Sequence, residues 1–138
     1  MKKILWIILA LSSFAACKKS KMPPVVLNSM LIGKWELHSR SGGNIYPPDT
    51  TYQPGNGNML QFNADSTYKS YTNGTLSRSG IFHTRTYISA SAIALRSDLL
   101  YFDNDTTFKS LINIGGGVLI IRPFMPDIGT TEYNKIAN

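Results

Sequence analysis

Residues 33–40 read Gly33-Lys34-Trp35-Glu36-Leu37-His38-Ser39-Arg40. The apolar Trp35 and Leu37 alternate there with polar or charged neighbours, which is the period-two pattern of a strand with one buried face. We therefore expect Trp35 and Leu37 to point into a core. The polar side chains around them, Arg40 included, should point to the opposite face.

The same alternation recurs along the rest of the chain. Further strands are expected at Asn58–Asn63, Thr67–Asn73, Thr75–Thr84, Ala92–Arg96, Leu99–Phe102, Thr106–Ile114, Gly117–Arg122 and Thr130–Ile136. Turn residues separate them, at Asn73-Gly74, Ser97-Asp98, Asp103-Asn104-Asp105 and Gly115-Gly116-Gly117. No window of ten or more residues offers a capped amphipathic helix. Strands joined as sequential hairpins either close into a barrel or fold over as a sandwich, and closure is favoured because it removes exposed edges. The sequence thus predicts an all-β fold, an antiparallel up-and-down barrel of about eight strands.

The amino terminus has the pattern of a bacterial export signal. Lys2 and Lys3 precede an apolar run that ends before Lys18, and this run is too short for a stable membrane span. Cys17 is the only cysteine, so no disulfide can form within the chain. We expect a signal peptide over residues 1–16, a lipidated cysteine with a flexible tether over 17–29, and a barrel domain over 30–138.

A short motif supports lipidation of Cys17. The residues Phe14-Ala15-Ala16-Cys17 resemble the bacterial lipobox, although leucine is commoner at the first position. The resemblance implies cleavage before Cys17 and attachment of acyl chains that hold the protein in membrane lipid. The alternative is an ordinary cleaved leader with a free thiol. Lys18 stands where aspartate marks inner-membrane retention in such lipoproteins, which implies the outer membrane. The periplasmic leaflet is favoured, with the cell surface as the alternative.

Charge and composition limit the function classes. The formal net charge is +6, but from Met22 onward nine basic residues face eight acidic ones, so nucleic-acid binding is not expected. His38 and His83 have no third ligand at metal-binding spacing, and no nucleophile motif is present. The sequence predicts a non-enzymatic protein without a metal or cofactor.

Three segments carry a family resemblance. Leu31–Leu37, Leu60–Tyr68 and Ser79–Phe82 together resemble the small bacterial lipocalin-like lipoproteins, in a match that spans about residues 31–136. The resemblance implies that Trp35, two residues after Gly33, plugs the closed end of the barrel. It also implies that Arg122, from a late strand, packs over the indole ring.

Two functions stay open. Either the barrel carries a small hydrophobic ligand inside, or the domain is an envelope interaction module that binds an unknown protein or a glycan through its surface or its 41–57 loop. That loop is expected to be a lid, a binding loop or a mobile segment. An internal cavity of roughly 300 Å³ would favour the carrier, and a filled barrel with an exposed aromatic patch the module. The candidate lining residues are Leu37, Leu60, Phe62, Tyr68, Phe82, Ile93, Leu95, Tyr101, Phe108, Ile112 and Ile120.

Overall fold

The computed structural model describes residues 27–43, 49–88, 96–125 and 128–137. Within them lie one short helix and nine strands. These are α2 (Leu27–Leu31), β1 (Gly33–Gly43), β2 (Thr50–Thr51), β3 (Met59–Phe62), β4 (Thr67–Thr72), β5 (Thr75–Ile88), β6 (Arg96–Phe102), β7 (Lys109–Gly115), β8 (Val118–Pro123) and β9 (Ile128–Ile136). In this part of the chain, no helix is long and apolar enough to cross a membrane.

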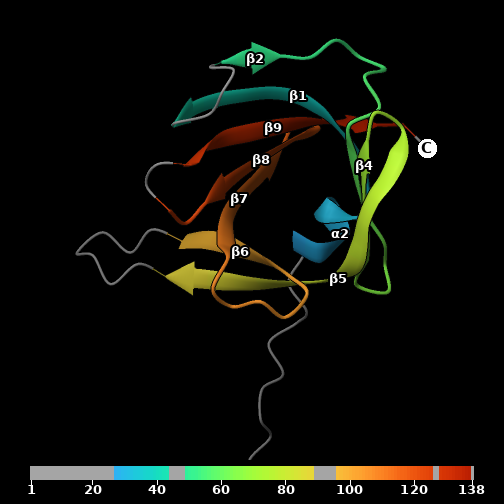
Figure 1. Cartoon of the computed structure of the whole chain (residues 1–138). Helices are drawn as coiled ribbons and strands as arrows, with labels where there is room; N and C mark the ends of the chain where they lie inside the picture. Colours follow the sequence, from blue (N-terminus) through green and yellow to red (C-terminus); the bar gives the residue numbers. More distant parts are fainter. Residues whose placement is uncertain (1–26, 44–48, 89–95, 126–127, 138) are drawn as a thin grey trace, which may run out of the picture.

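The strands form a closed antiparallel barrel. From β3 to β9 each strand pairs with the next in the sequence, while β1 pairs with β3 on one side and with β9 on the other, which closes the ring. One strand, β2, is not part of this ring and pairs with the later part of β1 (Figure 1). The predicted fold class, an up-and-down barrel of about eight strands, is confirmed.

Several expected boundaries are wrong. The turn predicted at Ser97-Asp98 does not form, because both residues belong to the continuous strand β6, where Asp98 pairs with Thr86 and accepts a 3.0 Å hydrogen bond from its hydroxyl. Strand β7 begins at Lys109 rather than at Thr106. The expected strand residues 92–95 lie outside the described residues.

The short helix α2 was not predicted, and its first residues fall in the expected tether. It closes one end of the barrel, since the side chain of Leu31 is fully buried and the backbone oxygen of Leu31 accepts a 2.7 Å hydrogen bond from Nε1 of Trp35. The buried core around it comprises Leu31, Trp35, Leu60, Phe62, Tyr68, Phe82, Leu100, Ile112, Leu119 and Ile121. Two of its rings, Phe62 and Phe82, meet edge to face with centroids 5.0 Å apart.

The barrel is self-contained. Each of its eight ring strands has both neighbours within residues 33–136, and one apolar core fills its α2 end. A closed sheet with its own core has what a domain needs to fold independently. We therefore expect residues 22–138 to fold without the preceding segment.

A β-bulge changes the facing of β1. Opposite β9, Leu37 pairs with Tyr133 and Arg40 pairs with Thr131, with a register shift between Leu37 and Ser39. Residues opposite each other in a ladder share a face, and Tyr133 and Thr131 are two residues apart. Arg40 thus lies on the face of Leu37, contrary to the uninterrupted alternation expected from the sequence.

Candidate functional site

The closed end of the barrel is built around Trp35. Its side chain is fully buried, and Nζ of Lys135 lies 5.0 Å from the centre of its ring. The same ammonium donates a 3.2 Å hydrogen bond to the backbone oxygen of Met30 in α2. Lys135 therefore joins the last strand, the helix and the indole ring.

Arg122 does not have the role that the family resemblance implies. It is exposed on β8, and its Nε donates a 3.2 Å hydrogen bond to the hydroxyl of Thr130. Arg122 lies opposite Leu111, next to the paired inward residues Ile112 and Ile121, so its side chain is on the outer face. The cation over Trp35 comes from β9 instead.

Gly33 also belongs to this closed end. Its φ of +130° is one that side-chain-bearing residues rarely adopt. A Cβ atom at this position would lie 3.1 Å from Cε of Lys135. Gly33 therefore allows the chain to turn from α2 into β1 while the lysine stem passes close by.

The structure brings together six of the expected lining residues. Buried side chains are found at Leu37, Leu60, Phe62, Tyr68, Phe82 and Ile112. All except Leu37 belong to the packed core, so they fill the α2 end of the barrel with side chains. Ile93 and Leu95 lie outside the described residues, as does Cys17.

The expected inward facing is wrong for three residues. Phe108 is 62% exposed because it belongs to the loop before β7 and not to a strand. Tyr101 pairs with His83 and Lys109, while its neighbour Leu100 is fully buried, so Tyr101 lies on the outer face. Ile120 also lies on the outer face, because its neighbours Leu119 and Ile121 are both buried.

A pocket of about 310 Å³ lies at the edge of the packed core, and its lining includes the inward-facing Leu37 of β1 and Leu60 of β3. Along β1 it begins at Leu37, one inward position beyond Trp35, and extends to Arg40. We call it the mouth pocket. Its lining consists of Leu37, Arg40, Tyr52, Asn58, Met59, Leu60, Ser70, Tyr71, Thr72, Asn73 and Tyr133.

Arg40 and two tyrosines converge on the mouth pocket. The guanidinium carbon of Arg40 lies 6.0 Å from the ring centre of Tyr52, a cation–π arrangement. Burial raises the pKa of Tyr133 above its usual value, and the nearby charge of Arg40 partly opposes this. These residues come from β9, from the bulged part of β1 and from the segment after β2, so spacing in the sequence could not have grouped them.

Hydrogen bonds that each involve a backbone group hold the segment that carries Tyr52 to β1. The amide of Tyr52 donates to the oxygen of His38 at 2.7 Å, and the amide of Gly55 donates to both carboxylate oxygens of Glu36 at 3.0 Å. Asn56 donates to the oxygen of Leu37 at 2.9 Å. The later part of the expected 41–57 loop is therefore fastened along β1. Residues 44–48 lie outside the described residues.

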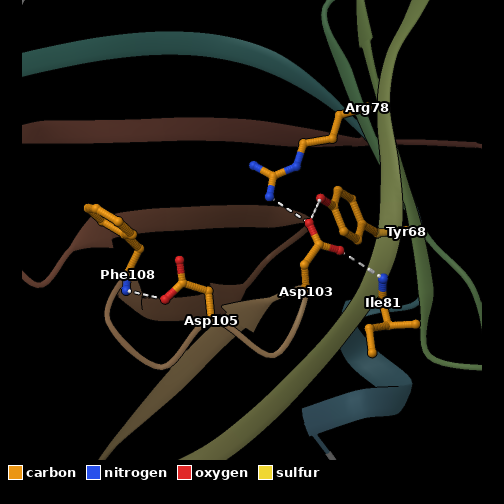
Figure 2. Close-up of polar contacts among 6 residues, drawn as sticks. All are labelled: Tyr68, Arg78, Ile81, Asp103, Asp105 and Phe108. Carbon is orange, nitrogen blue, oxygen red and sulfur yellow. Dashed lines mark hydrogen bonds and ion pairs between the residues drawn. The ribbon is translucent and has the colours of Figure 1, made fainter.

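A second polar cluster surrounds Asp103 in the loop between β6 and β7. Its carboxylate forms an ion pair with Arg78 and accepts hydrogen bonds from the hydroxyl of Tyr68 at 2.9 Å and the amide of Ile81 at 3.2 Å (Figure 2). The hydrogen bond from Arg78, followed by that from Tyr68, lowers the pKa of Asp103. A carboxylate with these three partners is a weak base, so the cluster fixes the loop to β5 rather than offering a proton acceptor.

Three apolar side chains in and near the same loop are exposed. Phe108, Phe124 and Met125 are 62%, 46% and 41% exposed, and the backbone amide of Phe124 donates to the oxygen of Lys109 at 2.9 Å. The ammonium of Lys109 lies 4.6 Å from the ring centre of Phe124. The segment after β8 therefore lies against the start of β7, which follows directly on the exposed Phe108. The sequence identified Phe108 as apolar but placed it inside.

Among the described residues, no three His, Cys, Asp or Glu side chains are grouped in a way that could hold a metal ion. The comparisons with known proteins add no relative: neither a protein-family model, nor a curated protein, nor a solved structure matches this chain.

Proposed function

We propose that this protein is a lipid-anchored envelope protein whose barrel binds a small organic ligand in the mouth pocket. The observation that carries the proposal is the pocket of about 310 Å³ in which apolar side chains meet a guanidinium and phenol groups. Ligand sites of about 300 Å³ and more commonly combine an apolar wall with a few polar groups that set orientation.

The core limits where a ligand can lie. The α2 end of the barrel is occupied by the side chains around Trp35, Phe62 and Leu100, each at most 1% exposed. Removing such side chains to make space would cost several kcal/mol. A ligand therefore fits at the mouth of the barrel, and only its apolar part reaches Leu37 and Leu60.

The anchoring part of the proposal depends on the amino-terminal sequence. The apolar run followed by Phe14-Ala15-Ala16-Cys17 is the support for export and acylation. Lys18 supports the outer membrane as the destination. We propose no catalytic role for Asp103, since its carboxylate is engaged by Arg78, Tyr68 and Ile81.

Nuclear magnetic resonance titration tests the binding proposal. We expect 3-phenylpropanoate, 3-phenylpropanol or 3-phenylpropylamine, added to ¹⁵N-labelled residues 22–138, to shift amides around Leu37, Leu60 and Tyr133. Ser70→Phe, which fills the pocket, should abolish the shifts, whereas Ser79→Phe on an exposed part of β5 should retain them. Shifts confined to other regions, or none at millimolar concentration, would reject the pocket as a ligand site.

A second function is favoured by the exposed apolar side chains of Phe108, Phe124 and Met125. A contiguous exposed apolar surface commonly marks a protein interaction site, and we propose that these three side chains form one. An interaction module would use these three side chains to bind another envelope protein. A photo-crosslinking residue at position 108 in intact cells should then give one discrete adduct, and the same residue at the exposed position 85 should not.

A further inference from the structure

We propose that the mouth pocket selects organic anions, with Arg40 as the residue that recognises the negative group. This inference rests on the proposed function and specifies the charge class of the ligand. The first argument is the β-bulge between Leu37 and Ser39, which places Arg40 on the same face of β1 as the buried Leu37. Without that bulge, the guanidinium would lie on the outside of the barrel.

The charges around the pocket form the second argument. Among the described residues, the pocket lining contains no carboxylate. The ion pair found among the described residues joins Arg78 to Asp103, and Arg40 is not part of it. Arg40 contacts the ring face of Tyr52, which orients a guanidinium without neutralising its charge. The planar fork of this group matches a carboxylate.

The neighbouring groups suit the rest of such a ligand. Tyr133, half-buried opposite Leu37, carries a phenol hydroxyl that can donate to an anion. Leu37 and Leu60 supply an apolar wall on the core side of the pocket. A volume of about 310 Å³ holds about ten waters, so the ligand would have about ten non-hydrogen atoms. The expected class is a small organic acid with an apolar body.

The test compares 3-phenylpropanoate with 3-phenylpropanamide, which differ in charge and hardly in shape. By calorimetry and amide shifts on residues 22–138, the acid should bind at least about fivefold more tightly in 50 mM NaCl, as a charge-assisted hydrogen bond predicts. Arg40→Gln should remove this preference, whereas Arg85→Gln, the same change at an exposed site on β5, should leave it intact. Raising the salt to 500 mM should weaken binding of the acid and not of the amide.

Each result has a distinct meaning. Equal affinity for the acid and the amide, or a preference retained in Arg40→Gln, would overturn the anion selectivity and leave the binding site standing. Binding of neither compound at the pocket would overturn the proposed function and this inference together. Arg40→Lys serves as a second variant: it keeps the charge without the fork, so part of the preference should remain.

Discussion

Gly80 and the carboxylate of Asp103 share one space, since a Cβ atom built on Gly80 would overlap Oδ1 of Asp103. The same Cβ would lie 3.0 Å from Cε1 of Tyr68. The absence of a side chain at position 80 therefore lets the loop between β6 and β7 bond to the amide of Ile81. In the sequence, Gly80 is noticeable only as part of a family-like motif.

Gly80→Ala should destabilise the protein by about 1 to 3 kcal/mol, the usual cost of inserting a methyl group where no space exists. Gly80 does not have a positive φ, so the cost comes from the overlap and not from backbone strain. On an Asp103→Gly background the same substitution should cost less, because the overlapping carboxylate is gone. Equal costs in both backgrounds, measured by urea unfolding, would show that the two residues do not compete for space.

Tyr68 should titrate late. Burial first, and its hydrogen bond to Asp103 second, raise the pKa of its phenol from 10 to about 12. A raised folded-state pKa means that the unfolded chain loses this proton first, so the contribution of Tyr68 to stability should be constant below pH 10 and fall as the pH rises from 10 to 12. In spectrophotometric titration, the component absent from Tyr68→Phe should have its midpoint near 12. A midpoint near 10 would contradict a buried, bonded phenol.

Acid should loosen the Asp103 cluster. The pKa of Asp103 is lowered by its bonds to Arg78 and Tyr68, so its contribution to stability is complete above about pH 4 and is lost as the pH falls through the lowered folded-state pKa. Asp103→Asn should therefore be less stable than wild type at pH 7 and should lose less stability between pH 4 and pH 2. Glu132→Gln, which also removes one carboxylate, is the control. An unchanged acid profile in Asp103→Asn would remove the cluster from the account of acid sensitivity.

Lys135, rather than Arg122, should support the closed end. Trp35→Ala should cost about 3 to 5 kcal/mol because a fully buried indole and its bond to Leu31 are lost. Lys135→Met should cost about 0.5 to 2 kcal/mol through the lost cation–π contact. Arg122→Gln should stay within about 0.5 kcal/mol. The reverse order of the last two would favour the arrangement that the family resemblance implies.

Trp35 also gives an optical signal for these experiments. The chain has two tryptophans, and Trp6 lies before residue 22, so emission from residues 22–138 comes from Trp35 alone. It should be blue-shifted in the folded domain and move to the red on unfolding.

Lipidation should depend on Cys17. Cells that express the full chain should incorporate radiolabelled palmitate into the wild-type protein and not into the Cys17→Ala variant. If residues 14–17 act as a lipobox, the thiol of Cys17 is the attachment point of the lipid. Lys18→Ala, with the cysteine intact, should still be labelled. Equal labelling of wild type and Cys17→Ala would reject the lipoprotein proposal.

The sequence alone determined the strand content and most of the core. Alternation at Trp35 and Leu37 predicted an inward face, and both are buried. The turn at Asn73-Gly74 was also predicted, because an Asn-Gly pair favours the two positive φ angles of such a hairpin. Both residues have a positive φ in the structure. These features depend on neighbours in the chain, and period-two burial is a local property.

The tertiary structure decided which side chains meet across the barrel. The bulge in β1 moves Arg40 to the face of Leu37, and a shift of one residue reverses the facing of every side chain beyond it. The stagger of the closed ring likewise selects Lys135, and not Arg122, as the cation over Trp35. Alternation along one strand carries no information about register between strands. The mouth pocket and the contacts at the closed end depend on that register, so only the tertiary structure could show them.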